Sequence, residues 1–301
     1  MNQKNRRFAA VDVLYILLMI LPITAALVLK ILTTPLSEGV SITGAQIYFT
    51  IPMPVQDLPI TSAQINSWLV ILSILGFCLY MTHGIQARHG TRRQHLAEWA
   101  VEITDKMVAG SMGSFFAGYS PMIASILVLS AFSSLLSLFG LFPPTSDINV
   151  VGGWAILVFI LITYNKLKGG FLHYLKGFTE PIFVMAPMNV LSEVATPVSM
   201  AFRHYGNVLS GSVIAVLIST ALQGLSAKLL GWLPGFLGEI PFLQIGLPAV
   251  LSLYFDIFSG CMQAYIFAML TMLNVSLALP FEEYEKRKAK KIEKQKQKMK
   301  A

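Results

Sequence analysis

Six long apolar stretches dominate this sequence and limit the folds open to it. A membrane-crossing helix needs about 20 mostly apolar residues, and in lipid its backbone polar groups must bond within the helix. Only 12% of the 301 residues are charged, against about 25% in an average soluble domain. The sequence therefore predicts an all-α integral membrane protein with about six transmembrane segments. The candidate segments span residues 11–32, 68–85, 115–142, 150–164, 182–222 and 243–279.

The apolar segments differ in length, and the regions between them differ in composition. The last two segments are longer than one crossing requires, so we expect both to tilt or bend. Residues 34–66 contain four prolines, which predicts an extended external loop. Residues 92–112 place their apolar side chains on one helical face, which is typical of an amphipathic helix at a membrane surface. That apolar set is Leu96, Trp99, Ala100, Ile103, Met107 and Val108.

Basic residues indicate the orientation of the chain. They gather in residues 1–7, 86–106, 166–180 and 282–300, whereas the loops between these clusters carry acids only. The positive-inside rule places the clusters in the cytoplasm, so both termini should lie inside. The first segment also has features of a signal peptide. We expect a retained helix, because the apolar run is long and Lys30 marks its outer edge.

We expect four regions along the chain: an extra N-terminal transmembrane helix over 1–33, the external loop over 34–66, a core over 67–281 and a basic cytoplasmic tail over 282–301. The tail holds nine basic and four acidic residues. We interpret it as a solvated helix end that contacts anionic membrane lipid, rather than as a nucleic-acid-binding segment. Neither cysteine lies in a metal-ligand spacing, so no metal site and no cofactor are predicted.

A polar stripe interrupts the fifth apolar segment. Its members recur every three or four residues, which places them on one helical face. Arg203 lies within the stripe, and charged residues inside membrane helices are costly and usually functional. Packing between helices would explain the hydroxyl groups but not the guanidinium. The stripe consists of Ser192, Thr196, Ser199, Arg203, Asn207 and Ser210.

The sixth segment carries a second stripe, formed by Ser252, Asp256, Ser259 and Gln263. Helical spacing places Asp256 and Gln263 two turns apart on one face. Desolvation would favour the protonated form of an intramembrane carboxyl group, so Asp256 is a candidate for proton exchange. Two polar stripes with one fixed cation and few other charges suggest that small ions move through this part of the chain.

Several segments resemble subunit a of F-type ATP synthases, the stator ion channel beside the rotating c-ring. The most specific is PMNVLSEVATPVSMAFRHYGNVLSG, residues 187–211, which centres on Arg203. DIFSGCMQAYIFAMLT, residues 256–271, resembles the last helix of that family and holds Gln263 at the matching position. SLFGLFPP at 137–144 and FLHYLKGFTEP at 171–181 resemble further family segments. The resemblance extends over about residues 67–280.

The resemblance implies two offset aqueous half-channels that meet at a carboxylate of the c-ring. Arg203 would separate the half-channels and face the ring carboxylates. The remaining ion-pathway residues implied are Asn189, Glu193, Ser199, Asn207, Asp256 and Gln263. The chain would carry protons or sodium ions in a bacterial inner membrane, with the c-ring and the subunit b stalk as partners. It would not be catalytic alone.

The sequence departs from the family pattern at three notable positions. Ser137 stands where asparagine is frequent, His204 where leucine is usual, and Ser212 where many members have an acid. Asp256 would compensate for Ser212, and we favour a packing role for His204.

Other classes of membrane protein explain the same residues less well. A secondary ion-coupled transporter is the alternative, but it would predict inverted repeats, which the sequence lacks. An intramembrane hydrolase would need facing Ser–His or Asp–Asp side chains, and Ser210 and His204 lie six residues apart on one helix. A purely structural anchor would not explain Arg203.

Overall fold

The computed structural model describes residues 3–33, 44–54, 56–86, 90–179, 182–230 and 242–300, and helices dominate it. A π-helical segment, η6 (Leu253–Ser259), joins α8 to α9, and short 3₁₀ turns flank several helices. The long helices are α1 (Gln3–Thr33), α2 (Ser62–Thr82), α3 (Arg92–Met112), α4 (Ser120–Leu135), α5 (Ile148–Lys168), α6 (Phe171–Thr179), α7 (Ala186–Leu230), α8 (Phe242–Ser252), α9 (Gly260–Leu277) and α10 (Phe281–Lys300).

Within the described ranges, six helical stretches are long and apolar enough to cross a membrane. They confirm the predicted all-α membrane class and the expected number of crossings. The stretch at Phe183–Leu229 has 47 residues. At 1.5 Å per residue it is about 70 Å long, whereas the hydrocarbon core of a bilayer measures about 30 Å. A helix of this length fits a bilayer only when it is strongly tilted or bent.

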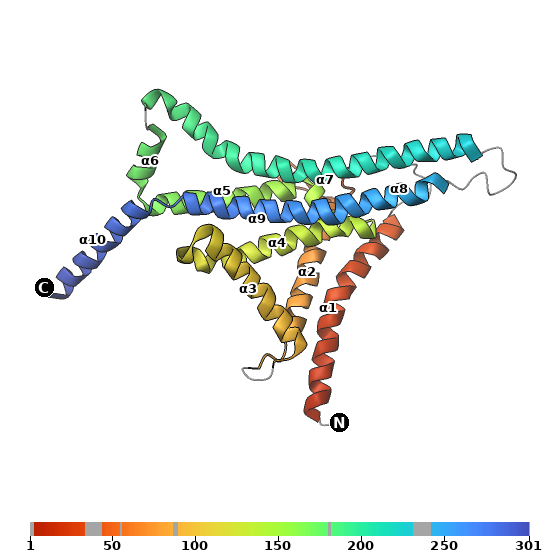
Figure 1. Ribbon diagram of the computed structural model, residues 1–301, viewed down its shortest axis with the longest axis horizontal. Helices are drawn as coiled ribbons and strands as arrows, with labels where there is room; N and C mark the ends of the chain where they lie inside the picture. Colours follow the sequence, from red (N-terminus) through yellow and green to blue (C-terminus); the bar gives the residue numbers. More distant parts are fainter. Residues whose placement is uncertain are drawn as a thin grey trace.

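Helices α4, α5, α7, α8 and α9 form an elongated layer (Figure 1). The segment formed by α8 and α9 runs along α7, while α5 and α4 lie beside them. Helices α1, α2 and α3 leave this layer at a steep angle, and α10 extends away from it at the C-terminal end. Pro197 lies inside α7 and removes one backbone hydrogen bond. Such a residue is a common cause of helix bending, and α7 is visibly curved.

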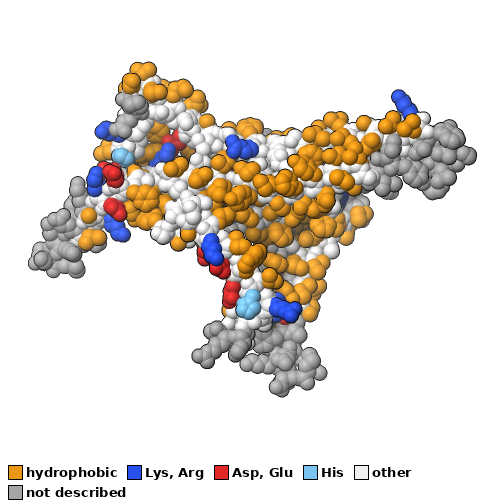
Figure 2. Space-filling model, in the orientation of Figure 1, with side chains coloured by type: hydrophobic (Ala, Val, Ile, Leu, Met, Phe, Trp, Pro, Cys, Tyr) orange, Lys and Arg blue, Asp and Glu red, His pale blue; other side chains and the backbone are white. Residues whose placement is uncertain are grey.

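The main buried cluster lies among α3, α4, α5 and α9, and its largest fully buried side chains include Phe116, Ile123, Phe267 and Met272. Helix α7 contributes little to this core, because only 6% of its most apolar stretch is buried inside the chain. Hydrophobic side chains cover much of the surface over α7, α8 and α9, whereas charged side chains gather near α3, α6 and α10 (Figure 2). This distribution suits a chain surrounded by lipid.

The region predicted as an extended external loop contains regular structure. Strands β1 (Ile47–Ile51) and β2 (Leu58–Thr61) pair as an antiparallel hairpin, and α2 already begins at Ser62. The sequence of β1, IYFTI, is rich in β-branched and aromatic residues, which favour strands. A two-stranded sheet has only edge strands, where proline is tolerated, so Pro59 does not prevent pairing. Part of the predicted loop, residues 34–43, lies outside the described residues.

Helix α3 matches the predicted bounds of the amphipathic helix. Its C-terminal half packs into the core through Val108 and Met112, while Leu96 and Trp99 in its N-terminal half stay exposed. An exposed apolar face on an otherwise charged helix is the pattern expected at a lipid surface.

Helix α1 packs along α2 and is held at both ends. Ser73 Oγ donates a hydrogen bond of 2.7 Å to the carbonyl of Met19 near the middle of the pair. Asp12 Oδ1 lies 2.9 Å from His83 Nδ1 and 3.1 Å from Arg93 Nη1 at one end. At the other end, the Lys30 ammonium donates to the Gly140 carbonyl. The N-terminal helix is therefore an integral part of this fold.

Gly76 permits the close approach of α1 and α2. A Cβ atom at this position would lie 2.7 Å from the Met19 backbone nitrogen and 2.9 Å from the Leu18 carbonyl carbon. Backbone atoms cannot move aside as a flexible side chain can, so alanine would separate the helices. We expect Gly76→Ala to destabilise the chain by about 1–3 kcal/mol, measured as a shift of the unfolding midpoint in mixed detergent.

Gly152→Ala is the matched control, because a Cβ atom at Gly152 would meet nothing within 4 Å. Both glycines lie inside apolar helices, so the change in helix propensity is the same. Equal unfolding midpoints for the two variants would contradict close packing of α1 against α2.

Candidate functional site

The Arg203 side chain is exposed on the middle of α7. Among the described residues, it has no ion-pair or hydrogen-bond partner. Three more members of its polar stripe, Ser192, Ser199 and Ser210, are also exposed, so the part of this face around Arg203 is not covered by the described residues. An unpaired guanidinium in a membrane-spanning helix is costly next to lipid. The face therefore requires a partner of opposite charge or water.

The residue next to Arg203 points inward. His204 is fully buried, with its Nε2 atom 3.3 Å from Ser130 Oγ. The rings of Trp154 and Phe267 contact the imidazole edge to face, with centroid distances of 5.9 and 5.5 Å. These contacts with α4, α5 and α9 hold α7 in one rotational position, which leaves the adjacent Arg203 pointing outward.

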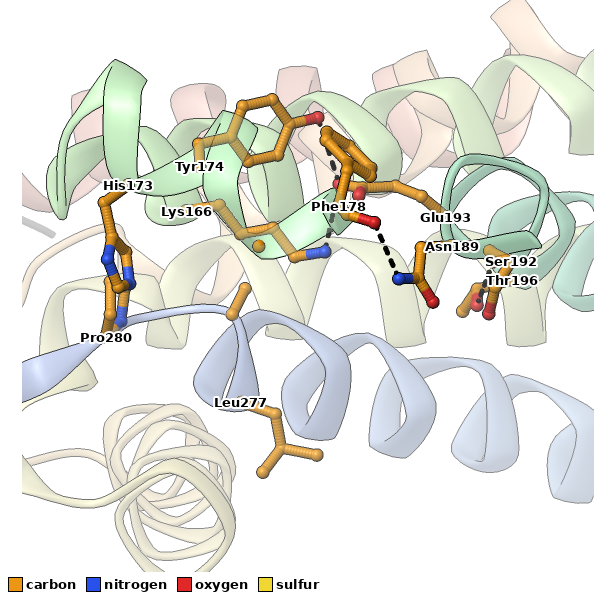
Figure 3. A pocket seen from close by; sticks show the side chains of 12 residues that line it. Lys166, His173, Tyr174, Phe178, Asn189, Ser192, Glu193, Thr196, Leu277 and Pro280 are labelled. Atoms are coloured by element: carbon orange, nitrogen blue, oxygen red, sulfur yellow. Dashed lines mark hydrogen bonds and ion pairs between the residues drawn. The ribbon is translucent and has the colours of Figure 1, made fainter. Parts of the chain in front are cut away.

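One polar cavity of about 410 Å³ lies where α6 meets the first turns of α7. We name it the Glu193 cavity, and Figure 3 shows how its side chains converge. The Glu193 side chain is only 7% exposed and lies 3.0 Å from Lys166 Nζ. Tyr174 Oη donates a hydrogen bond of 3.3 Å to the same carboxylate oxygen. The lining also includes His173, Asn189, Ser192, Thr196 and Pro280.

Two features keep the side chains around Glu193 in place. Burial, reinforced by the negative charge of Glu193, raises the pKa of the Tyr174 hydroxyl, so the phenol stays protonated and can donate to the carboxylate. Asn189 Nδ2 donates a hydrogen bond of 2.8 Å to the Phe178 carbonyl, which ties α6 to α7. The Lys166 ammonium and the Tyr174 hydroxyl thus hold the Glu193 carboxylate in one position.

A second cavity, of about 560 Å³, lies on the other side of Arg203. We name it the Asp256 cavity. Asp256 is half-buried in the π-helical segment η6 and accepts a hydrogen bond from Ser252 Oγ. The wall comes from α1, β1, α2, the segment after α4, α7 and η6. Its polar and charged side chains are Lys30, Gln46, Tyr48, Ser62, Asn66, Ser137, Ser212 and Asp256.

Asn207 and Gln263 line neither of these cavities. Asn207 Nδ2 donates a hydrogen bond of 2.8 Å to Ser259 Oγ, which fixes α7 against η6. Gln263 is only 4% exposed, and its Nε2 atom has no hydrogen-bond partner within the described ranges. The polar stripe that contains Asp256 and Gln263 does not line one continuous cavity. The π-helical turn holds more residues than an α-helical turn, so the spacing of the two side chains changes.

Arg203 lies between the two cavities along α7. Glu193 precedes it by ten residues and Ser212 follows it by nine. At 1.5 Å per residue these separations are about 15 and 14 Å. Arg203 and Ser199 line neither cavity. The helix thus carries a polar cavity, a free guanidinium and a second polar cavity, in that order.

Sequence reasoning missed several residues of these cavities. Lys166 and Tyr174 were visible only as parts of a basic loop, and Lys30 only as the end of a span. Tyr48 lies in the hairpin that was not predicted. No local pattern could reveal them, because each reaches its cavity from a distant segment. Among the described residues, no group of three His, Cys, Asp or Glu side chains could hold a metal ion.

Comparisons with known proteins give consistent results. The profile of the ATP synthase A chain family matches residues 64–276. The sodium ion specific ATP synthase subunit a of Propionigenium modestum is 26% identical over 84% of this chain and 89% of its own length. Subunit a of Desulforamulus reducens is 33% identical over 70% of this chain and 77% of its own. That of Limosilactobacillus reuteri is 29% identical over 73% and 93%.

The family profile extends over more than half of the chain and includes α7, Arg203 and both polar stripes. Together with the six membrane-spanning stretches, this match shows that the chain belongs to the ATP synthase A chain family, the subunit a proteins of ATP synthase.

Proposed function

We propose that this chain is the ion-translocating stator subunit of a rotary F-type ATP synthase, with two half-channels that meet at carboxylates of the c-ring. The observation that carries the proposal is the order along α7: the Glu193 cavity, the unpaired Arg203 and the Asp256 cavity. An ion would enter one cavity, neutralise a ring carboxylate, travel with the ring through lipid and leave through the other cavity.

Arg203 would interact with each ring carboxylate in turn. A guanidinium stays protonated in proteins, so it attracts an ionised carboxylate and cannot relay protons itself. Attraction to the charged form promotes release of the bound ion. The fixed positive charge also repels cations that would otherwise pass directly between the cavities. The exposure of Arg203 on an uncovered face of α7 supports a partner at this position, and the c-ring is the partner that we propose.

The Glu193 cavity would be the cytoplasmic half-channel. It lies beside α6 and the start of α10, where basic residues gather. The positive-inside rule assigns this side to the cytoplasm, together with both termini. Glu193 would transfer the ion, with Lys166 and Tyr174 holding its carboxylate in place and Asn189 anchoring the adjacent turn.

The Asp256 cavity would be the outer half-channel. It lies beside the hairpin and the end of α1 that the orientation rule assigns to the outside. Asp256 would accept ions from the outer solution, and Ser212 faces the same space. The Asn207–Ser259 hydrogen bond lies closer to Arg203 and would fix the inner end of this path. Ser199 and Gln263 would contribute further polar atoms near the ring.

The membrane that we propose is a bacterial inner membrane, with subunit b of the peripheral stalk as a further partner. The membrane potential supplies about 2.3 kcal/mol per elementary charge for each 100 mV. The transported ion is a proton or a sodium ion. The sodium ion specific relative from Propionigenium modestum makes both ions necessary in any test.

The first test of this function concerns coupling. Arg203→Ala should abolish ATP-driven ion pumping completely, because nothing then separates the half-channels or promotes ion release. Pumping is measured as acidification and as sodium uptake by inverted membrane vesicles that hold the complete synthase. Assembly and ATP hydrolysis by the soluble head are measured in the same vesicles.

Lys228→Ala provides the matched control, since Lys228 is an exposed cation near the C-terminal end of the same helix. It should leave pumping unchanged. Normal pumping by an assembled Arg203→Ala complex would overturn the proposal and favour a secondary transporter instead.

The second test of this function concerns the outer half-channel. Asp256→Ala should slow ATP-driven pumping by about tenfold or more, because proton transfer by a positioned side chain contributes about 10²–10⁴-fold in enzymes. The complex should still assemble, because Asp256 is half-buried and bonds only locally to Ser252. Asp57→Ala, at an exposed acid beside the hairpin, should change nothing. Loss of the assembled complex would make Asp256 a structural residue.

A further inference from the structure

Residues outside the family profile build one wall of the Asp256 cavity. The profile begins at residue 64. Six lining residues precede it, so the N-terminal helix and the hairpin enclose a space that the core alone would leave open. These residues are Ala26, Lys30, Gly44, Gln46, Tyr48 and Ser62.

Lys30 is the charged member of this wall, and its ammonium has a defined position. It donates to the carbonyl of Gly140, directly after the 3₁₀ turn Leu136–Phe139 that extends α4. The carbonyl groups at a helix end carry partial negative charge and attract cations. Gly140 adopts a left-handed backbone with φ +69°, and a Cβ atom there would lie 3.2 Å from Lys30 Nζ. Glycine therefore leaves room for the ammonium.

Few other charges face this ammonium. Among the described residues that line the cavity, the titratable side chains are Lys30 on α1, Tyr48 on β1 and Asp256 on η6. The lining from α2, from the segment after α4 and from α7 is uncharged, and it consists of hydroxyl, amide and apolar groups. Lys30 is thus the one fixed cation in the described wall of the cavity that also contains Asp256.

We propose that Lys30 is a specificity-determining residue that controls how readily a cation from outside reaches Asp256. This inference rests on the proposed function, which assigns the cavity to the outer half-channel. A fixed positive charge in a confined cavity lowers the local concentration of cations and raises that of anions. Lys30 therefore raises the outer ion concentration needed to drive rotation, and α1 supplies this control to a core that lacks it.

The test uses the complete synthase in liposomes with the soluble head facing outward, so that the lumen contacts the outer half-channel. ATP synthesis is measured against lumenal pH at fixed sodium, and against lumenal sodium at fixed pH, under a constant potential. Lys30→Gln retains a donor for the Gly140 carbonyl but removes the charge. Lys30→Arg retains the charge. Lys106→Gln removes an exposed cation on α3, far from the cavity lining.

Lys30→Gln should lower the half-saturating concentration of the transported ion by about four- to sixteenfold, the size expected for one unit charge at a separation taken as about 10 Å with an effective dielectric constant near 20–40. High concentrations of an inert salt should remove the difference, because the Debye length falls to about 3 Å at 1 M. Lys30→Arg and Lys106→Gln should match the unaltered chain. A shift caused only by loss of a structural contact would not depend on the salt concentration.

An equal half-saturating concentration for Lys30→Gln and the unaltered chain would overturn the inference. A shift of the same size in the half-saturating concentration for Lys30→Arg would also overturn the inference. That variant keeps the positive charge, so the effect would then follow the shape of the side chain. Arg203→Ala separates the two proposals. If the Arg203→Ala synthase still couples ion flow to ATP synthesis, the proposed function itself fails. If Arg203→Ala is uncoupled and Lys30→Gln leaves the half-saturating concentration unchanged, only the role of Lys30 is refuted.

A second variant covers the case in which Lys30→Gln fails to assemble. Lys30→Cys is made in a chain whose Cys78 and Cys261 are replaced by alanine. After assembly, the thiol is modified with a neutral or an aminoethyl methanethiosulfonate reagent. The cationic adduct should restore the higher half-saturating concentration, and the neutral adduct should not. Identical values for both adducts would refute the inference.

Discussion

The unpaired positive charge of Arg203 is the constraint on which the rest of this structure depends. A guanidinium cannot lose its proton in a protein and is costly beside lipid, so the face of α7 that carries it must meet water or a negative partner. The other face of the helix must then be held firmly. Buried contacts of His204 with Trp154, Phe267 and Ser130 provide that support, and they leave Arg203 exposed at the centre of a long helix.

Close helix packing separates the polar cavities on either side of this charge. A Cβ atom at Gly260 would lie 2.7 Å from Ser134 Cβ, and one at Gly211 would lie 3.0 Å from the Phe255 ring. Small residues allow helices to approach closely within membranes, where no hydrophobic effect drives them together. The Asn207–Ser259 pair adds a hydrogen bond across the same interface. Among the described residues, the two polar cavities thus lie toward the two ends of the path that we propose.

Much of the fold was predictable from the sequence, because hydropathy over about 20 residues reports a membrane crossing directly. The six spans were found in this way, and the amphipathic helix α3 was found from the helical spacing of its apolar side chains. The hairpin β1–β2 was missed, since the prolines beside a short strand resemble a loop. The π-helical segment around Asp256 was missed as well. Regular α-helical spacing was assumed there, and no residue in the segment signals the wider turn.

The sequence by itself determined the membrane class, the helical spans and the polar stripe with Arg203, because each depends on neighbours within a few helical turns. Only the tertiary structure decided which side chains share a cavity. Lys166 and Tyr174 reach Glu193 from α5 and α6, and Lys30 enters the Asp256 cavity from the other end of the chain. Contacts between distant segments depend on how helices cross and how closely their backbones approach, and no local pattern encodes either property.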